Sequence, residues 1–183
     1  MKAVVFIDVQ NDFVKGGKLA FGYPAEDNTN KVVEFAKQCI ADGGAKLYAT
    51  LDTHYNDYEK TLEGKKLPVM HCIEGTDGWR LNEQLEDVLI ENATFVNKPT
   101  FGSYDLVGIF EEDFGKAGPD EITLVGYDLS VCVLANAVLL RAKYPNVKIV
   151  IKANLCGDVD EAAFNAAVKV LQMQQIEVVD AIV

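Results

Sequence analysis

The chain has 183 residues, enough for one domain with a sizeable core, and its 49% hydrophobic and 25% charged residues are typical of globular proteins. The formal net charge of −11 argues against a nucleic-acid binder, which would present a basic face to the phosphates. No apolar run approaches the roughly 20 residues of a membrane helix, so we expect no membrane partner.

The predicted strands are short apolar runs with little polar alternation, as expected for strands buried on both faces. In chain order they cover residues 3–7, 46–51, 94–96, 121–125, 147–151 and 176–179. Amphipathic stretches between them predict helices over residues 28–41, 82–90, 106–116, 131–143 and 160–172. Alternating strands and helices imply a parallel sheet with helices on both faces. We therefore predict one α/β domain over residues 1–183, with a doubly wound, mainly parallel six-stranded sheet.

The four cysteines are scattered without a CxxC pair or an even spacing; they are Cys39, Cys72, Cys132 and Cys156. The first apolar run is too short for a signal-peptide core and leads directly into acidic residues. We therefore expect a cytoplasmic protein whose thiols are reduced, with one candidate for a reactive thiol.

Polar side chains follow the predicted strands at the ends where open parallel sheets bind ligands. In chain order they are Asp8, Asp52, His54, Lys98 and the segment 126–128 shortly before Cys132. Four strands thus bring a carboxylate, an Asp-x-His pair, an ammonium group and a thiol to one edge of the sheet.

Cys132 lies where the chain passes from a strand into a helix, at or near the helix N-terminus. There the helix dipole and the free N–H groups favour a thiolate, and the same N–H groups could hold an oxyanion. Taken alone, such a cysteine is more often a small apolar residue of a buried helix. The other cysteines lack this setting and are assigned structural roles.

Asp8 ends a hydrophobic strand, where a carboxylate is either a local cap or a partner for chemistry. Lys98 by itself would be read as surface charge. A lysine confined beside a thiol would instead stabilise the thiolate, while a nearby carboxylate could take up the thiol proton.

Both histidines of the chain lie in the interval 53–79, a long segment without clear periodicity. Loops of that length inside compact domains are usually functional. Two imidazoles with carboxylates can bind a borderline divalent ion such as zinc and leave positions for water or substrate. A single histidine is more often a polar core or loop residue, so the prediction of a metal site depends on several ligands lying together. The candidate ligands are Asp52, His54, Glu63 and His71.

From residue 4 to about residue 179 the chain resembles the isochorismatase-like cysteine hydrolase superfamily, and within it the nicotinamidases. The resemblance rests on the segments 8–13 (DVQNDF), 52–54 (DTH), 71–76 (HCIEGT), 97–99 (NKP) and 126–133 (GYDLSVCV). Each segment alone is weak evidence, but the set is specific. It implies a Rossmann-like fold of three layers.

The resemblance also implies the catalytic roles. Cys132 matches the nucleophile, Asp8 the acid/base and Lys98 the third catalytic residue. The backbone N–H groups of Asp128 and Cys132 match an oxyanion hole, and a cis peptide bond is implied between Tyr127 and Asp128.

By the same resemblance, Asp52, His54 and His71 match metal ligands, with zinc expected first and manganese or iron as alternatives. Lys60 stands where many nicotinamidases carry another histidine, and Glu63 is our candidate for the ligand that replaces it.

For the substrate pocket, Phe13 matches a lining aromatic residue, and Tyr127 is a further candidate for substrate contact. Departures from the family pattern at Pro68 and over residues 128–131 concern this pocket, so the choice of amide stays open.

The sequence therefore predicts a metal-assisted hydrolase of a small amide, in the first place nicotinamide, through a thioester on Cys132. One alternative is another amidase of the superfamily, acting on a carbamoyl compound or a different small amide. A second is a catalytically idle binding or oligomerisation module, and a redox role for Cys132 is a third. Isochorismatase itself fits less well, because it cleaves a vinyl ether without a cysteine nucleophile or this metal cluster. A homo-oligomer is implied by the resemblance only.

Overall fold

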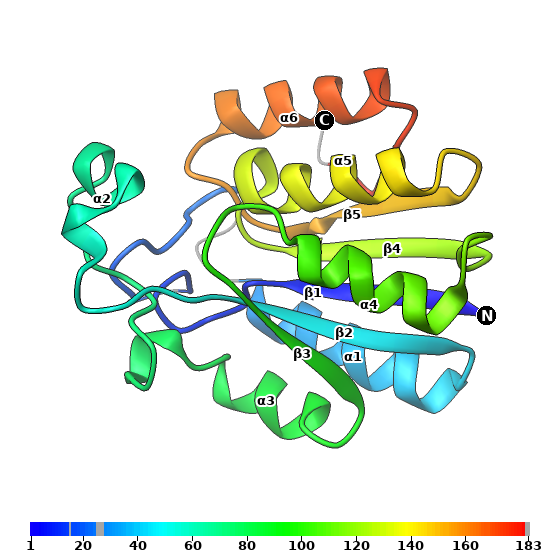
Figure 1. The fold of residues 1–183 in the computed structure, drawn as a ribbon, viewed down its shortest axis with the longest axis horizontal. Coiled ribbons are helices and arrows are strands. Elements are labelled where there is room, and N and C mark those ends of the chain that lie inside the picture. The colour runs from blue at the N-terminus through cyan, green and yellow to red at the C-terminus, as the bar shows by residue number, and fades with distance from the viewer. Residues whose placement is uncertain (15, 25–27, 182–183) are drawn as a thin grey trace.

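The computed structural model describes residues 1–14, 16–24 and 28–181, and a central sheet runs through it (Figure 1). The strands are β1 (Lys2–Ile7), β2 (Ala45–Asp52), β3 (Ala93–Lys98), β4 (Glu121–Gly126), β5 (Lys148–Cys156) and β6 (Glu177–Val179). They form one six-stranded sheet in the order β3-β2-β1-β4-β5-β6, and each neighbouring pair is parallel. The predicted α/β fold and its strands are confirmed.

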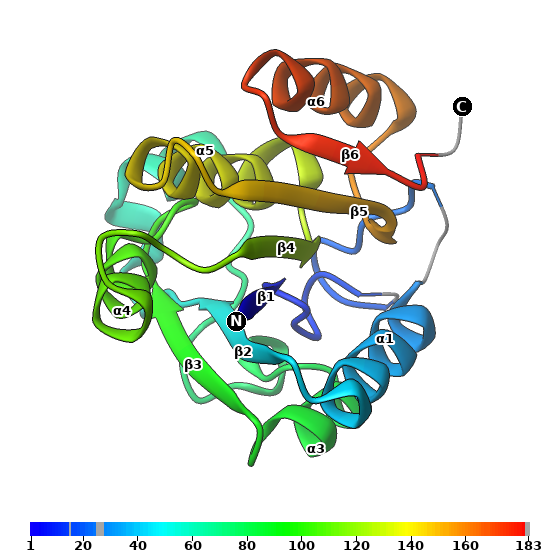
Figure 2. The ribbon, with the colours of Figure 1, turned by 90° about the vertical axis from the view of Figure 1, so that its right-hand side faces the viewer.

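Helices cover both faces of the sheet (Figure 2). One face carries α1 (Thr29–Asp42) and α3 (Glu83–Leu89); the other carries α4 (Tyr104–Phe114), α5 (Leu134–Lys143) and α6 (Glu161–Met173). None of the helices in the described ranges has the length and apolar character needed to cross a membrane.

The two helical layers enclose two hydrophobic cores, one on each side of the sheet. In β1, Ala3, Val5 and Ile7 belong to the core under α4, α5 and α6, whereas Val4 and Phe6 belong to the core under α1 and α3. Successive side chains of a strand point to opposite faces, so a strand covered on both faces must be apolar throughout. Each fully buried side chain of this size contributes about 1.5–3 kcal/mol to folding.

The helix predicted over residues 131–143 begins earlier and differently. It opens with a π-helical turn, η3 (Leu129–Val133), which α5 then continues. The amide of Val133 donates to the carbonyl oxygen of Asp128, five residues back, at 2.9 Å. Turns of this kind are rare and are frequent at functional sites, and this one contains Cys132.

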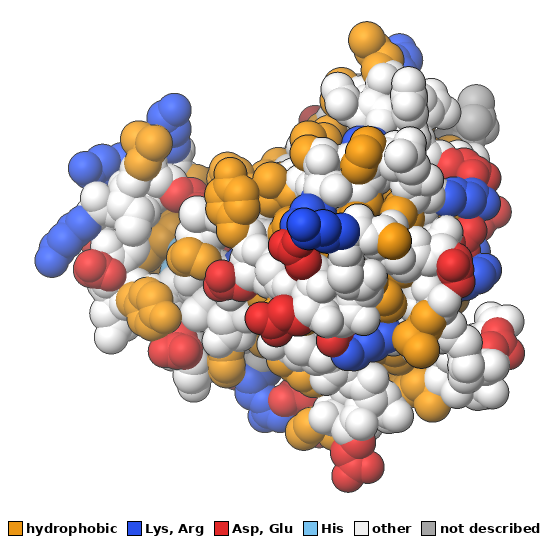
Figure 3. Space-filling view, turned by 45° about the vertical axis from the view of Figure 1, so that its right-hand side comes forward, with side chains coloured by type: hydrophobic (Ala, Val, Ile, Leu, Met, Phe, Trp, Pro, Cys, Tyr) orange, Lys and Arg blue, Asp and Glu red, His pale blue; other side chains and the backbone are white. Residues whose placement is uncertain are grey.

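The interval 53–79 contains the short helices η1 (Tyr58–Lys60), α2 (Leu62–Lys66) and η2 (Asp77–Trp79). The part around α2 projects from the body of the molecule (Figure 1), and basic side chains gather on this projection (Figure 3). Lys60, Lys65 and Lys66 are its exposed lysines. The amide of Gly64 donates to the hydroxyl oxygen of Thr61, which caps α2.

Gly126, the last residue of β4, occupies a position that suits only glycine. Its φ is 121°, and a Cβ atom there would lie 2.0 Å from the carbonyl oxygen of Ile7. We expect Gly126→Ala to lower the free energy of unfolding by at least about 2 kcal/mol, as measured by urea denaturation. The control is Gly108→Ala on α4, where a Cβ atom would meet nothing within 4 Å. It should raise the free energy of unfolding by about 0.5–1 kcal/mol, and equal effects of both substitutions would contradict the prediction.

Candidate active site

Four neighbouring strands deliver the three predicted catalytic residues and one predicted metal ligand to one edge of the sheet. Asp8 follows β1, Asp52 ends β2, Lys98 ends β3, and Cys132 lies in the turn after β4. Because the sheet order places β3, β2, β1 and β4 side by side, these side chains meet at the carboxyl ends of the strands. All four residues are buried, Asp8 completely and Lys98 to within 1%.

Lys98 is the centre of this group. Its Nζ atom lies 2.7 Å from Oδ2 of Asp8, 3.4 Å from Oδ1 of Asp52 and 3.5 Å from Sγ of Cys132. Nζ also donates to the carbonyl oxygen of Thr100 at 3.1 Å. Burial by itself lowers the pKa of Lys98, but the negative charges of the Asp8 and Asp52 carboxylates beside it oppose that effect, and the pKa lies above its ordinary value. The side chain therefore stays an ammonium group.

Asp8 is held in an unusual backbone conformation, with a φ of 51°, in the left-handed region that non-glycine residues seldom adopt. The hydroxyl of Thr50 donates to Oδ1 of Asp8 at 2.7 Å, and Lys98 binds its other oxygen. Burial raises the pKa of Asp8, and the charge of Lys98 offsets this only in part. A carboxylate with a raised pKa is a better proton acceptor, as a general base requires.

The buried surroundings of Cys132 favour the thiol over the thiolate. Burial raises its pKa well above the ordinary value, the charge of Lys98 opposes this, and the charges of Asp8 and Asp52 add to it. Loss of water at this buried position therefore works against the thiolate that the helix start is expected to favour. The thiol needs a base before it can attack, and Asp8 lies close enough to hydrogen-bond to it.

The four candidate metal ligands come together beside this group. One ligand atom from each of Asp52, His54, Glu63 and His71 lies within 4.8 Å of the others. Oδ2 of Asp52 is 2.9 Å from Nε2 of His54 and 3.3 Å from Nε2 of His71, and Oε1 of Glu63 is 3.6 and 3.7 Å from the same nitrogens. Lys60 is exposed and is not part of the cluster.

The donor set and its surroundings fit a divalent metal ion. Nδ1 of His71 is 2.7 Å from the carbonyl oxygen of Val69, a contact that leaves Nε2 free to face the cluster. Burial acts to raise the pKa of Asp52, but Lys98 and the two imidazoles outweigh it and hold the pKa below its ordinary value. Two imidazoles with ionised carboxylates are ligands for zinc, manganese or iron. Asp52 joins this cluster to the catalytic group, since its other oxygen faces Lys98.

A cavity of about 370 Å³ opens beside Cys132. The ligands Asp52, Glu63 and His71 form part of its wall, and Phe13 lies in the wall as well. Asp128, expected from the sequence as an oxyanion-hole residue, also lines the cavity. Sequence reasoning missed the remaining wall residues, which are Leu19, Ala20, Phe21, Leu67, Phe101, Val131 and Val159. Most belong to loops without hydrophobic periodicity, so no sequence signal marks them apart from the presence of apolar side chains in loops.

Tyr127 does not belong to the cavity wall. Its ring lies 6.0 Å from that of Phe21, which in turn stacks on Phe13 at 5.3 Å, so Tyr127 packs behind the wall. Its hydroxyl donates to Oδ1 of Asn28. The expectation of substrate contact at Tyr127 therefore finds no support in the geometry, whereas the cis peptide bond expected between Tyr127 and Asp128 is present.

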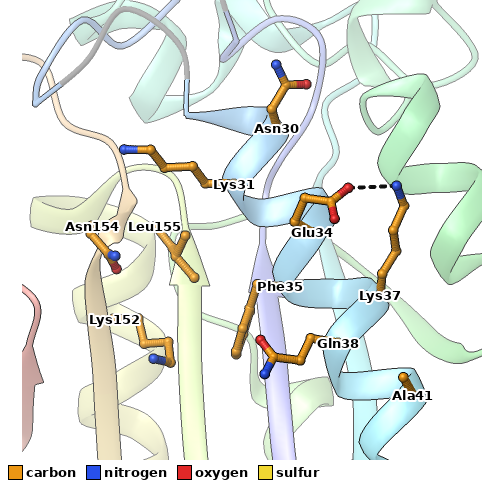
Figure 4. Close-up of a pocket in the computed structure, with 10 residues that line it drawn as sticks. All are labelled: Asn30, Lys31, Glu34, Phe35, Lys37, Gln38, Ala41, Lys152, Asn154 and Leu155. Atoms are coloured by element: carbon orange, nitrogen blue, oxygen red, sulfur yellow. Dashed lines mark hydrogen bonds and ion pairs between the residues drawn. The ribbon is translucent and has the colours of Figure 1, made fainter.

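A larger hollow of about 780 Å³ lies elsewhere, between α1 and β5 (Figure 4). Lys37 pairs with Glu34 at 2.8 Å on its helical side, and Nζ of Lys152 lies 5.4 Å from the centre of the Phe35 ring on the other. Among the residues that the structure describes, none of its lining residues is a histidine, cysteine or aspartate. The chemistry available at the smaller cavity makes that cavity the candidate active site.

Comparisons with known proteins agree with this geometry. A family model described as the isochorismatase domain matches residues 2–182. The nicotinamidase/pyrazinamidase of Mycobacterium tuberculosis is 28% identical over 149 residues, which cover 75% of this chain and 77% of that protein. A crystal structure of nicotinamidase/pyrazinamidase from Bacillus subtilis matches with a TM-score of 0.83 and 25% identity, over 97% of this chain and 98% of that one. The pyrazinamidase of Pyrococcus horikoshii, solved in complex with zinc, shares the fold with a TM-score of 0.77 and 19% identity, over 98% and 99% of the two chains.

The ligand cluster predicts that metal binding depends on Glu63 and His71. We expect titration with Zn²⁺, Mn²⁺ or Fe²⁺ to give one bound ion per chain, measured by calorimetry and by metal analysis after dialysis. His71→Ala should weaken binding at least about 100-fold, and Glu63→Gln should weaken it by about 10-fold or more. The matched control is Glu59→Gln, an exposed carboxylate one turn before α2, which should change nothing. Equal affinity for Glu63→Gln and Glu59→Gln would remove Glu63 from the ligand set.

Proposed function

The chain belongs to the isochorismatase family, and from this premise we propose that it is a metal-dependent cysteine amidohydrolase, in the first place a nicotinamidase. The observation that carries the proposal is the contact of Lys98 with both Asp8 and Cys132, at a cavity whose wall also holds three of the four candidate metal ligands. The relatives from Mycobacterium tuberculosis and Bacillus subtilis, both named for nicotinamide and pyrazinamide hydrolysis, support this choice of substrate.

In the first step Asp8 accepts the proton of the Cys132 thiol, and the sulfur attacks the amide carbonyl carbon. Lys98 contacts both the proton donor and the proton acceptor, so the negative charge remains next to the ammonium group as it moves from carboxylate to sulfur. This contact reduces the electrostatic cost of forming a thiolate in a buried cavity.

The attack forms a tetrahedral oxyanion, which the backbone N–H groups of Asp128 and Cys132 would bind. Each such donor contributes about 2.7–4 kcal/mol in other acyl-transfer enzymes. Protonated Asp8 then gives its proton to the departing ammonia, the C–N bond breaks, and a thioester remains on Cys132. Water, deprotonated by Asp8, attacks the thioester carbonyl; the C–S bond breaks and the thiol recovers the proton.

The cluster of Asp52, His54, Glu63 and His71 would hold the metal, for which we propose zinc, as in the related Pyrococcus horikoshii structure. When bound, the ion supplies a Lewis-acid site for a ring nitrogen and so orients a heteroaromatic amide in the cavity. The stacked rings of Phe13 and Phe21, both in the cavity wall, provide apolar contact for a flat ring.

A second candidate substrate class is favoured by the exposed apolar residues at the cavity mouth. Leu67, Phe101 and Val159 line the cavity and are 38%, 46% and 59% exposed. Such a rim could cover an apolar substituent on the ring. The alternative is therefore an amidase of the same mechanism that prefers a substituted aromatic amide.

The thioester mechanism predicts that Cys132→Ala abolishes ammonia release from nicotinamide by the metal-loaded protein. We expect a loss in kcat of at least about 10³-fold, because the variant lacks the nucleophile. Cys39→Ala, at a partly buried position of α1 outside the cavity wall, serves as the control and should keep full activity. Mass spectrometry of wild type quenched during turnover should detect an acyl group on the peptide that contains Cys132. Full activity of Cys132→Ala would refute the mechanism.

The cavity predicts a preference for ring-bearing amides. Nicotinamide should be hydrolysed with a kcat/KM at least about tenfold above that of acetamide, because an aliphatic amide cannot pack on Phe13 and Phe21. Steady-state ammonia assays on nicotinamide, 5-alkyl nicotinamides and acetamide test this. Higher kcat/KM for the alkylated rings would favour the second candidate, and a preference for acetamide would contradict both.

A further inference from the structure

Two buried carboxylates, Asp128 and Asp158, share one serine beside the nucleophile. The amide of Ser130 donates to Oδ1 of Asp128 and to Oδ2 of Asp158, at 2.9 Å in each case. The hydroxyl of Ser130 lies 3.0 Å from Oδ1 of Asp128 and 3.1 Å from Oδ1 of Asp158. Asp158 is completely buried and Asp128 is 6% exposed.

This carboxylate pair has no positive partner among the described residues. Neither side chain forms an ion pair with a lysine, arginine or histidine there, unlike Asp8 and Asp52 at the catalytic group. Burial, followed by the charge of Asp158, raises the pKa of Asp128 to about 7. When protonated, Asp128 hydrogen-bonds to Asp158. Two like charges in contact without a counter-ion favour a single shared proton.

Asp158 also joins two parts of the active site through its backbone. It exchanges two hydrogen bonds with Tyr23, at 2.8 and 3.2 Å, and so fixes the end of the loop whose residues 19–21 line the cavity. The amide of Leu129, the first residue of η3, donates to the carbonyl oxygen of Gly157 at 2.9 Å. The segment around Asp158 thus supports both the turn that carries Cys132 and one wall of the cavity.

We propose that Asp158 is a positioning residue of the active site, which holds the Cys132 turn through Ser130 while one proton is shared between its carboxylate and that of Asp128. The proposal deepens the proposed amidohydrolase function and rests on it where activity is the readout. Loss of the shared proton leaves two negative charges beside the backbone amides proposed to bind the oxyanion. The second charge opposes the charge that develops there in the transition state.

Few other titratable groups face this pair. Cys156, at the end of β5, is a thiol whose pKa burial raises to about 12, so it stays neutral over the working range. Asp160 and Glu161 at the start of α6 are exposed, and Cys132 itself lies further along η3. We therefore assign the proton that is lost here as the pH rises to the pair Asp128 and Asp158.

The test compares wild type with Asp158→Asn over pH 6 to 8.5. The carboxamide can still accept from Ser130 and can donate to an ionised Asp128, and it has no charge of its own, so the pair in the variant carries at most one negative charge at any pH. We expect kcat/KM of the variant to stay within about threefold of wild type at pH 6. The kcat/KM of the variant divided by that of wild type should then rise at least about fivefold by pH 8.5, because wild type alone loses the shared proton. Asp160→Asn, an exposed helix cap, is the matched control and should give a flat ratio.

Thermal unfolding supplies a readout that does not need activity. Because the pKa of Asp128 is higher in the folded than in the unfolded chain, wild type should lose stability as the pH rises from about 4 to about 7. The fall in Tm between pH 5 and pH 8 should be smaller for Asp158→Asn than for wild type and Asp160→Asn.

Asp158→Ala tests the positioning role separately, because alanine cannot bind Ser130. We expect kcat at pH 6 to fall at least about tenfold in Asp158→Ala and to be restored in Asp158→Asn.

Two results would overturn the proposal: a ratio of kcat/KM that is flat with pH, or an equal pH dependence of Tm in Asp158→Asn and wild type. If wild type releases no ammonia from nicotinamide, the proposed function fails, and the Tm comparison still decides whether the pair shares a proton.

Discussion

A single buried ammonium group makes the active site possible. Lys98 is within 3.5 Å of Asp8, Asp52 and Cys132, in a region from which water is largely excluded. Without it, two carboxylates and a developing thiolate would repel one another with no counter-charge. Removing one partner of a buried ion pair commonly costs about 3–5 kcal/mol. The lysine therefore holds the acidic groups in place and couples the catalytic group to the metal-ligand cluster through Asp52.

The order of the strands in the sheet explains why Asp8, Asp52 and Lys98 meet. Asp8 and Lys98 are far apart along the chain, and β2 lies between their strands in the sheet. Asp52, at the end of that middle strand, consequently contacts Lys98 with one oxygen and the two imidazoles with the other. Parallel strands end at one edge, so three short local segments become one site once the sheet forms.

Several contacts fix the backbone of the turn after β4. Gly126 allows the strand to pass Ile7 without a steric clash, the π-helical turn follows, and Ser130 is bound by two carboxylates. Such a turn keeps Cys132, the proposed nucleophile, and the neighbouring amides in one orientation, which is what a preorganised oxyanion site requires. Its support comes from Asp158, so the proposed chemistry at Cys132 depends on a residue that contributes no atom to the reaction.

The sequence by itself determined the strands and the residues that end them, because burial on both faces of a sheet imposes continuous apolar runs. It also determined the five longer helices through their amphipathic pattern, but not the short helices between residues 53 and 79. It also marked Asp8, Lys98 and Cys132, since each lies in a short local motif. Only the tertiary structure decided the surroundings that raise the pKa of the Cys132 thiol, which are loss of water and charges from other strands. The tertiary structure also decided which residues form the cavity wall and that Asp128 lies next to Asp158. Both arise from loops that meet only in the folded chain, and contacts between distant loops leave no periodic pattern in a sequence.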